Sequence, residues 1–314
     1  MPAESEDPLA PFRAELRAHC YRMLGSSHDA EDVLQEVSLR AWRSSGGFQG
    51  RASRRTWLYR IATNACLNEL ERKERRVLPV DWGPGTDASV ASFAPVDGVA
   101  WIQPLPDDPQ QRAADRESLE LAFVAAVQHL SPNQRVALLM FDVLGFSNRE
   151  IAEMMETTTA SVRSALQRAR HTVAQLLPER TQQATISALG DEGQERLISR
   201  YTAALRQHDV DGMLALLTED ATWSMPPMPA WFQGHQAIAD FLLAAPFNVR
   251  WRHRPARANG QLAVGCYAFD EPTRTFTAYG LDVLDLRGDR IASVVSFIDG
   301  GRFGSFGLPP TLTD

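Results

Sequence analysis

Hydrophobic residues recur at helical intervals from residue 9 to about residue 78. In the stretch SHDAEDVLQEVSLRAW, an acidic first turn precedes apolar positions at helical spacing, namely Val33, Leu34, Val37 and Trp42. A Gly- and Ser-rich break, SSGGFQG at residues 44–50, separates this stretch from the next one. Acids in the first turn and a regular apolar stripe are typical of an amphipathic helix. The pattern therefore predicts an all-helical domain over residues 8–78.

A second helical region covers residues 118–178 and carries clear start signals. A serine followed by a proline at residues 131–132 places a capping residue before proline at the first helical position. After a break at Gly145, Ser147 has Glu150 three residues later, which is the spacing of a capping box. The apolar pattern then resumes behind ETTTA. We expect two helices joined by a short turn in this region.

The periodicity changes past about residue 190. Residues 195–225 predict two helices followed by a strand, and GHQAIADFLL predicts a further short helix. Alternating strands follow, with hairpin turns expected at Asn259-Gly260 and at Arg287-Gly288-Asp289. Helices followed by a strand meander indicate a separate α+β domain, which we place at residues 195–307.

Residues 79–117 connect the two helical regions and show no sustained period. They are rich in Pro, Gly, Asp and Ser, which favours a long linker that is ordered only where another segment holds it. Trp82 and Trp101 are unusual in such a tether. Two interpretations remain open: the tryptophans pack on a neighbouring domain, or they dock on a partner.

Composition is that of an ordinary globular protein. The 314 residues are 44% hydrophobic and 23% charged, and no apolar run reaches the roughly 18 residues of a membrane span. The first ten residues are acidic and contain proline, unlike a secretory signal peptide. Cys20, Cys66 and Cys266 are far apart and outside any CxxC spacing, so we expect neither a disulfide framework nor a metal site. A cytoplasmic protein without membrane association or cofactor is predicted.

The net charge of −7 conceals a localised pattern. Residues 8–78 carry a net +5 and residues 79–117 a net −5, whereas residues 190–314 carry a net −4. Residues 118–178 are neutral in sum, yet residues 158–177 hold three Arg and no acid. Localised cations determine what a surface attracts. The two basic stretches, one in each helical region, are therefore candidates for contact with nucleic acid.

The first basic stretch is RASRRTWLYRIATNACLNELERKERR, which has eight Arg or Lys against three Glu. If residues 57–76 form one helix, they have an apolar stripe of Leu58, Ile61, Ala62 and Ala65. Another face then contains Arg60, Asn64, Asn68, Arg72 and Arg75, next to Arg54, Arg55 and Trp57. Arginines neutralise phosphates, amides read base edges, and an indole stacks on an unpaired base. The alternative is a solvated amphipathic helix with Trp57 in the core.

The second basic stretch, SNREIAEMMETTTASVRSALQRAR, has the length and patterning of a helix-turn-helix. Ile151, Ala152 and Met155 are expected to pack against Val162 and Leu166. The second helix would then present Thr158, Ser161, Arg163, Ser164, Gln167, Arg168 and Arg170. Hydroxyl, amide and guanidinium groups near a helix N-terminus suit entry into the major groove. A helical hairpin that does not bind DNA would look similar.

These motifs resemble a known family. The stretch DAEDVLQEVSLRAW…FQGRASRRTWLYRIATNACLNELERKERR resembles region two of extracytoplasmic-function (ECF) RNA polymerase sigma factors, and LSPNQRVALLMFDVLGFSNREIAEMMETTTASVRSALQRAR resembles their region four. The whole layout resembles the sigma factors that carry a C-terminal SnoaL-like (NTF2-like) domain, here residues 195–307. The resemblance implies a multidomain fold: two all-α sigma domains, a region 2 helical bundle and a region 4 helix-turn-helix, followed by an α+β NTF2-like cone.

The resemblance also implies a non-enzymatic initiation subunit, which binds core RNA polymerase and promoter DNA and opens the strands. A docking set would meet the clamp of the polymerase largest subunit: Asp29, Glu31, Asp32, Gln35 and Glu36. A −10 set would handle the −10 element: Arg54, Arg55, Trp57, Arg60, Asn64, Asn68 and Arg72. A −35 set would read the −35 element: Thr158, Ser161, Arg163, Ser164, Gln167 and Arg168. Region four would meet the flap of the second subunit, and the acidic linker would thread toward the RNA exit path.

The turn of the helix-turn-helix departs from the family pattern. Glu156 and Thr157 stand where a small or Gly-like residue is common, and Ala165 replaces a frequent basic residue. These departures imply a −35 contact that is weaker or differently specified.

An NTF2-like cone implies an apolar pocket in the C-terminal domain. The pocket set that we expect to line it is Tyr201, Trp223, Met225, Trp231, His253, Tyr267 and Tyr279. Further candidates are Met228, Phe232, Phe269 and Phe297, with Asp220 and Asp282 as polar groups, although any of them could be core residues. No pair of carboxylates in the sequence indicates the proton transfer that ketosteroid isomerases, which have a related fold, catalyse. We expect a regulatory module whose pocket is available to a small-molecule ligand. We also expect Asp299–Arg302 to contact the linker or region two.

Two other functions remain open from the residues alone. One is a one-component regulator that binds duplex DNA through residues 118–178 and senses a ligand through residues 195–307. It leaves the basic, aromatic stretch at residues 51–76 without a purpose. The other is an isomerase- or hydrolase-like enzyme fused to a DNA-binding module.

Overall fold

The computed structural model describes residues 9–44, 53–89, 91, 93–108 and 116–313. The chain divides into two compact units, each of which combines segments that are distant in sequence. The helical unit consists of Met1–Arg76 and Asp108–Pro178, and the C-terminal unit consists of Val77–Asp107 and Glu179–Asp314. Most of the predicted linker therefore belongs with the C-terminal unit. The predicted break at residues 44–50 lies, apart from Ser44, outside the described residues.

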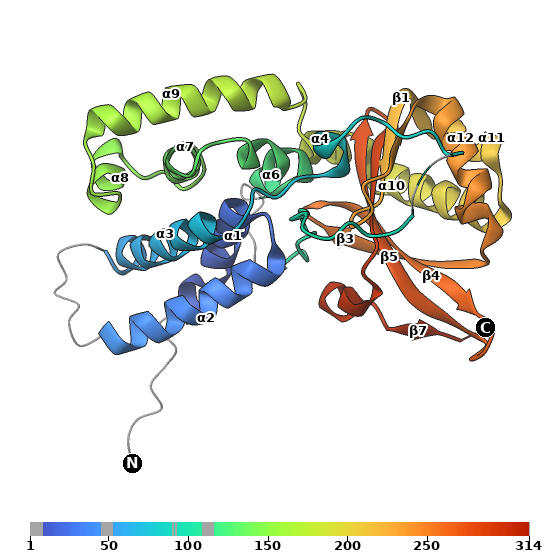
Figure 1. The fold of residues 1–314 in the computed structure, drawn as a ribbon, viewed down its shortest axis with the longest axis horizontal. Coiled ribbons are helices and arrows are strands. Elements are labelled where there is room, and N and C mark those ends of the chain that lie inside the picture. The colour runs from blue at the N-terminus through green and yellow to red at the C-terminus, as the bar shows by residue number, and fades with distance from the viewer. Residues whose placement is uncertain (1–8, 45–52, 90, 92, 109–115, 314) are drawn as a thin grey trace, which may run out of the picture. The chain divides into compact units, whose positions relative to one another are not determined.

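The N-terminal part of the helical unit is a bundle of three helices (Figure 1). After a short 3-10 helix, Ala10–Phe12, it contains α1 (Arg13–Leu24), α2 (Ser27–Ser44) and α3 (Arg54–Arg72). The basic stretch ends its helix at Arg72, so the prediction of one helix to residue 76 was wrong. The reason is tertiary: Lys73 and Arg76 turn back, and both bind the carboxylate of Asp29.

The second part of the helical unit contains four α-helices and a π-helical segment. Its elements are the 3-10 helix Glu117–Leu119, α6 (Leu121–Gln128), α7 (Pro132–Leu138), the π-helical segment Leu139–Val143, α8 (Asn148–Met154) and α9 (Thr159–Leu176). The expected capping residues are confirmed, because Ser131 and Ser147 each form a capping box, with Gln134 and Glu150. Gly145 adopts φ 73° at the predicted break. These signals set where α7 and α8 begin.

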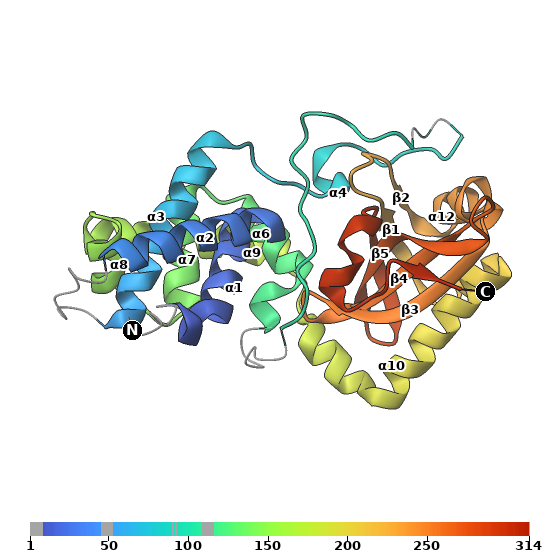
Figure 2. The ribbon, with the colours of Figure 1, turned by 90° about the horizontal axis from the view of Figure 1, so that it is seen from below.

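The C-terminal unit is an α+β domain with a mixed, seven-stranded sheet (Figure 2). Its helices are α10 (Gln182–Gln207), α11 (Val210–Leu214) and α12 (Gly234–Ala244), with 3-10 helices at Pro246–Asn248 and Gly300–Phe306. Its strands are β1 (Leu217–Ser224), β2 (Trp231–Gln233), β3 (Trp251–Ala258), β4 (Gln261–Asp270), β5 (Thr275–Arg287), β6 (Arg290–Phe297) and β7 (Thr311–Leu312). The strand order is β2-β1-β6-β5-β4-β3, with β7 paired to β5, and only β1 and β6 run parallel.

Both predicted hairpins are confirmed. Ala258 pairs with Gln261 around Asn259-Gly260, whose two residues adopt φ 57° and 71°. Positive φ at both central positions is the geometry for which Asn-Gly is favoured. The second hairpin joins β5 and β6 across Gly288-Asp289.

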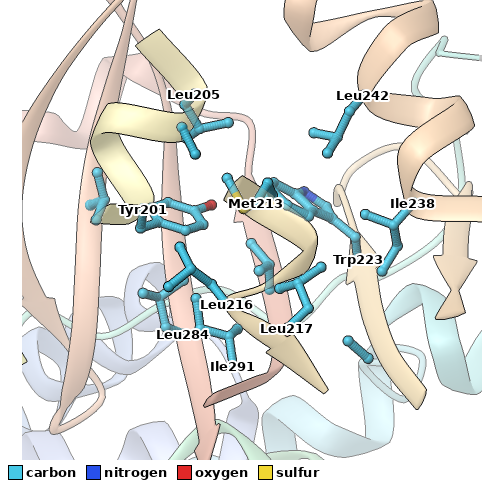
Figure 3. Close-up of a cluster of buried hydrophobic side chains, with 14 of the residues drawn as sticks. Tyr201, Leu205, Met213, Leu216, Leu217, Trp223, Ile238, Leu242, Leu284 and Ile291 are labelled. Atoms are coloured by element: carbon cyan, nitrogen blue, oxygen red, sulfur yellow. The ribbon is translucent and has the colours of Figure 1, made fainter. Parts of the chain in front are cut away.

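The core of the C-terminal unit lies between the sheet and helices α10 and α12. Tyr201 of α10 and Trp223 of β1 lie side by side in it, with ring centroids 6.1 Å apart (Figure 3). Successive strand residues point to opposite faces. Cys266 therefore faces Tyr201 and Asp282, whereas Tyr267 packs against Phe303 on the other face of the sheet.

Most of the described part of the linker belongs to the C-terminal unit. It contains α4 (Pro79–Trp82), and Val77, which precedes this helix, forms a parallel bridge with Trp101. Trp101 is 8% exposed, so its packing within this unit is confirmed. Trp82 remains 49% exposed and contacts the Trp101 ring edge-on. Among the described residues, none of the helices combines the length and apolar character needed to cross a membrane.

Candidate nucleic-acid interface and ligand pocket

The −35 set lies on one exposed face of α9. All six side chains are exposed, whereas the opposite face is buried at Val162, Ala165, Leu166, Ala169 and Val173. Thr158 caps the helix, since its hydroxyl accepts a hydrogen bond from the Ser161 backbone N–H at 3.1 Å. The guanidinium of Arg168 donates to the Ser164 hydroxyl at 2.7 Å. The helix thus presents short polar groups near its N-terminus and guanidinium groups one to two turns later, which suits groove readout.

Arg170 points away from this set. Its Nε donates to Asp142 in the π-helical segment at 2.9 Å, and its guanidinium lies over the Phe141 ring. The hydrogen bond and charge of Asp142 raise the pKa of Arg170. Arg170 therefore ties α9 to the segment that follows α7 rather than facing a groove.

The two departures from the family pattern have different structural meanings. Glu156 adopts φ 52° in the turn between α8 and α9, a left-handed conformation that costs a non-glycine residue about 1 kcal/mol. Its carboxylate accepts a hydrogen bond from Arg60 of α3 at 3.0 Å. Ala165 is 8% exposed and lies on the buried face of α9. A basic side chain at that position would point into the core of the unit and not toward DNA.

The −10 set does not form a uniform surface on α3. Arg54, Arg60, Asn68 and Arg72 are exposed, whereas Trp57 and Asn64 are half-buried. Arg55 is also half-buried, and it is engaged within the unit, because its Nε donates to Glu15 at 3.1 Å and its guanidinium lies over the rings of Tyr59 and Phe146. Its guanidinium therefore has partners inside the protein in this conformation.

The docking set lies on α2, with one member buried. Glu31 is half-buried and Asp32, Gln35 and Glu36 are exposed, but Asp29 is only 6% exposed. The Asp29 carboxylate accepts hydrogen bonds from Arg76 at 2.6 Å and from Lys73 at 3.0 Å. Burial disfavours its charged form, but Arg76 and Lys73 outweigh that effect and lower the pKa of Asp29. Asp29 thus fastens α2 to the end of α3.

His28, Asp29 and Asp32 lie close enough to suggest metal ligands. Polar groups of the protein already contact them, since His28 Nδ1 lies 3.0 Å from Asp32 and Asp29 binds two cations. These contacts account for the closeness of the three side chains.

A buried polar network joins the two halves of the helical unit, and no periodic pattern along the chain predicts it. His19 of α1 lies 2.9 Å from the Thr63 hydroxyl of α3, and burial, with the charges of Arg22 and Arg55, lowers the pKa of His19 to about 3. Arg135 of α7 donates to the backbone oxygens of Met23 and of two residues that precede α7, namely Gln128 and Leu130. Burial lowers the pKa of Arg135 to about 10. The one sequence signal for this network is a polar residue at an otherwise apolar helix position.

The linker is held by the hairpin tip between β3 and β4. The Leu105 N–H donates to Asn259 Oδ1 and the Asn259 N–H donates to the Leu105 oxygen, both at 2.9 Å. The Gly260 N–H donates to the Asp107 carboxylate at 2.7 Å. The Asn-Gly pair that the sequence marked as a turn is therefore also a clamp on the linker.

The Gly-rich segment near the C-terminus contacts the linker as well. Arg302 donates to Gln103 Oε1 at 2.9 Å and forms an ion pair with Asp299 at 2.7 Å. The predicted contact of Asp299–Arg302 with the linker is thus confirmed at Arg302. Its effect on activity stays a prediction.

An apolar cavity of about 270 Å³ opens in the C-terminal unit. It is lined by eighteen residues from the linker, α10, α12, five strands and the loops between them, among which Trp223, Met225, Met228, His253, Tyr279 and Asp282 were candidates from the sequence. Side chains that the sequence did not single out include Phe93, Phe241 and Trp251. Their contribution depends on how the linker and α12 fold over the sheet, which local sequence patterns do not report.

Three members of the pocket set lie elsewhere, and their assignment is corrected. Tyr267 points to the opposite face of the sheet, where its hydroxyl donates to the Pro309 oxygen at 3.0 Å. Trp231 holds the linker, because its Nε1 donates to the Gly83 oxygen at 2.9 Å. Tyr201 is fully buried beneath the cavity and donates its hydroxyl to Asp282 at 2.8 Å. Strand alternation explains the first case and the edge position of β2 the second.

Of the two acidic residues that were candidates for the pocket, only one lies at the cavity. Asp220 lies at the surface in an ion pair with Arg287 at 3.0 Å, whereas Asp282 is buried at the wall of the cavity. Burial raises the pKa of Asp282 although Ser296, Cys266 and Tyr201 all hydrogen-bond to it. A carboxylate that already accepts three protein donors is poorly placed to take a proton from a substrate.

The helix-turn-helix, the polar face of α3 and the separate α+β unit together define a transcription factor of sigma type with an appended domain. A family model described as Sigma-70 region 2 matches residues 10–76, and one described as Sigma-70, region 4 matches residues 120–173. A model described as SnoaL-like domain matches residues 198–294.

Full-length relatives identify the family within this class. The chain is 43% identical to the ECF RNA polymerase sigma factor SigG of Mycobacterium tuberculosis, over 96% of this chain and 83% of that protein. It is 28% identical to the ECF sigma factor SigJ of the same species, over 68% of this chain and 62% of that protein. The crystal structure of SigJ has the same fold, with a TM-score of 0.60, 22% identity and coverage of 95% of this chain and 97% of that one. The chain therefore belongs to the ECF RNA polymerase sigma factors.

Membership in this family gives both basic helices a function. The alternative of a one-component regulator left the first of them, at residues 51–76, without one. It also accounts for the order of the parts, since a sigma factor works with core RNA polymerase and promoter DNA. The predicted fold class, two helical sigma domains followed by an α+β NTF2-like domain, is confirmed.

Proposed function

We propose that three faces of the helical unit divide the work of initiation. On α2, Glu31, Asp32, Gln35 and Glu36 form the acidic surface that docks the clamp of the polymerase largest subunit. On α3, Arg54, Trp57, Arg60, Asn64, Asn68 and Arg72 contact the −10 element, and the −35 set on α9 contacts the −35 element. The observation that carries this proposal is the exposed polar face of α9 opposite a fully apolar one.

The helical unit must open to do this. The −10 and −35 elements are about 25 base pairs apart, which is on the order of 85 Å of duplex. In this conformation α3 and the helix-turn-helix touch, since Arg60 of the −10 set binds Glu156. An exposed ion pair of this kind contributes at most about 1 kcal/mol. Opening must also break the buried hydrogen bonds that join the two halves, such as that from Arg135 to the Met23 oxygen, and polymerase binding has to supply this free energy. We infer that polymerase, through its clamp and flap, separates the two DNA-binding parts.

The C-terminal unit acts on this opening through the linker. Residues 77–107 fold back on themselves at the Val77–Trp101 bridge and are clamped by Asn259, Gly260 and Arg302. Fully extended, a segment of this length spans on the order of 100 Å. A docked linker therefore withholds length that the separated domains need. This supports a regulatory and non-enzymatic role for the SnoaL-like domain.

The direct test is run-off transcription with purified core polymerase and a promoter selected by the holoenzyme. We expect transcripts only when this chain is present, and a chain truncated near residue 190 should give a different yield. Core polymerase that ignores the chain in a pull-down, or transcripts that do not depend on it, would contradict the proposal. Acting with polymerase on the chromosome, the protein is expected in the cytoplasm.

Trp57 offers a test of the role of α3. Its half-buried indole sits one turn inside α3, whose N-cap is Ser53. Trp57→Ala should reduce strand opening, followed by permanganate reactivity of unpaired thymines, more than it reduces polymerase binding. The matched variant Trp42→Ala removes an exposed indole from α2 and should leave opening per bound holoenzyme unchanged. Equal loss of binding and opening in Trp57→Ala would assign Trp57 to packing.

A further inference from the structure

The cavity in the C-terminal unit is closed on one side by a linker residue. Phe93 lines the cavity, and its ring centroid lies 6.2 Å from that of Phe241 in α12. Phe93 is 40% exposed, so its ring covers the cavity from the solvent side and is not itself part of the core. The wall therefore combines side chains of the regulatory domain with one side chain of the segment that connects the two sigma domains.

Hydrogen bonds fix the linker on both sides of Phe93. Before it, the Thr86 N–H donates to the Trp231 oxygen at 2.8 Å, and Trp231 Nε1 donates to the Gly83 oxygen at 2.9 Å. After it, the Val96 N–H donates to the Pro227 oxygen at 3.4 Å. Anchors on both sides define where the Phe93 ring can lie while the linker is docked. Release of the linker would remove this wall.

One polar side chain in the cavity wall lacks a partner. Nε2 of His253 is buried and makes no hydrogen bond among the described residues, although His253 lines the cavity. Burial, together with the charge of Arg206, lowers the pKa of His253 to about 4, so the ring is neutral at pH 7. A buried nitrogen without a partner is costly, and a ligand hydroxyl, which can both donate and accept a hydrogen bond, would satisfy it in either tautomer of the neutral ring.

The charges around the cavity exclude an anionic occupant. The described lining residues include no Arg or Lys, and their one carboxyl group, on Asp282, already accepts hydrogen bonds from Tyr201 and Cys266. A buried anion would lie beside this carboxyl group without a cation among the lining residues to pair with it. The cavity volume of about 270 Å³ suits a molecule with one ring or with two fused rings, because a cavity of roughly 150 Å³ holds benzene.

We propose that this cavity binds a neutral, mainly apolar small molecule with one hydroxyl group directed at His253, and that Phe93 makes this binding and linker docking stabilise each other. The inference rests on the proposed regulatory role of the domain only for its effect on transcription. Because a ligand buries apolar surface against Phe93, it favours the docked linker. By linkage, the docked linker raises ligand affinity by the same factor.

Equilibrium binding of three matched probes to the full-length chain tests the ligand class. Naphthol carries one hydroxyl, naphthalene carries none, and naphthoate carries a carboxylate on the same skeleton. We expect naphthol to bind about fivefold more tightly than naphthalene, since one hydrogen bond contributes about 1 kcal/mol. His253→Phe should abolish this preference. Absence of saturable naphthol binding, or naphthoate binding as tight as naphthol, would overturn the proposed ligand class.

The coupling has its own readout. Phe93→Ala should weaken naphthol binding roughly three- to tenfold, the effect of removing one aromatic ring from the wall. Leu243→Ala, at an exposed apolar residue of α12 outside the cavity wall, is the matched control and should leave affinity unchanged. Naphthol should also slow hydrogen exchange at the amides of Thr86 and Val96 in the wild type but not in Phe93→Ala. Tight binding with unchanged exchange would overturn the coupling, whatever run-off transcription shows.

Discussion

Glu156 shows how a single residue can serve two opposed requirements. Its φ of 52° is unfavourable for any side chain, yet its carboxylate binds Arg60 across the helical unit. The ion pair is largely exposed, with 51% and 76% of the two side chains accessible, so its contribution is small. The sequence drew attention to this position because a small residue is common there. The structure adds that the side chain contacts α3.

Replacing Glu156 by glycine should therefore stabilise the turn while breaking the pair. We expect Glu156→Gly to raise the free energy of unfolding by about 0.5–1 kcal/mol, the relief of the left-handed conformation less the added entropy of the unfolded chain. Glu156→Gln keeps the strain and removes only the charge, so it should change stability by less than about 0.5 kcal/mol. Urea denaturation measures both. A destabilised glycine variant would mean that the pair with Arg60 dominates.

His19 gives the helical unit a pH dependence whose sign follows from its burial. Its pKa is about 3 in the folded chain against an ordinary value of 6.5, so the unfolded chain binds more protons between these values. Stability should be constant above about pH 6.5 and should fall by about 1.4 kcal/mol for each pH unit below it. His19→Gln should remove the part of the slope that His19 contributes and leave the part that comes from His253 of the C-terminal unit, measured by urea denaturation between about pH 4 and 7. The exposed His171→Gln should keep it.

At the scale of elements, α9 makes the sharpest prediction about DNA. Arg163→Ala and Arg168→Ala should each weaken promoter binding by the holoenzyme and lower the salt dependence, by about 0.9 in the slope of log affinity against log salt for each phosphate that is no longer neutralised. Arg149→Ala is a matched control, because Arg149 is exposed on α8 and paired with Glu153 at 3.0 Å. Filter binding over a salt series measures the slopes. An equal effect of Arg149→Ala would point to general electrostatics rather than to the α9 face.

Elements were predictable from the sequence where a local signal defines them. The capping residue at Ser131, the capping box at Ser147 and the turn at Asn259-Gly260 depend on neighbouring residues alone, and all are confirmed. The end of α3 was not predictable, because Lys73 leaves the helix to reach an aspartate 44 residues earlier. Some of the predicted pocket residues were wrong for a related reason, because their placement also depends on tertiary structure. Period-two alternation separates Cys266 from Tyr267, but the sequence does not say which face of the strand meets the cavity.

At the scale of the whole molecule, the linker was the least predictable part. Its composition is that of a tether, and its anchors are scattered: a buried Trp101, a bridge at Val77, two hydrogen bonds to Leu105 and one to Asp107. The positions of these anchors follow no regular spacing along the sequence. Their partners at the hairpin tip lie more than a hundred residues further along the chain, so only the folded structure brings them together. The composition correctly indicated a segment that needs another to hold it.

Control of the linker by the hairpin tip yields the last prediction. Asn259→Gly keeps the positive φ of the turn but removes the side-chain oxygen that accepts from the Leu105 N–H. A weakening of about 1 kcal/mol should speed hydrogen exchange at the Leu105 amide roughly fivefold. Since a freed linker supplies the length that the separated sigma domains need, run-off transcription should rise. Asp289→Gly, in the other two-residue hairpin, is the control and should change neither quantity. Faster exchange at Leu105 with unchanged transcription would mean that docking of the linker does not limit opening of the helical unit, and regulation by the C-terminal unit would then have to act by another route.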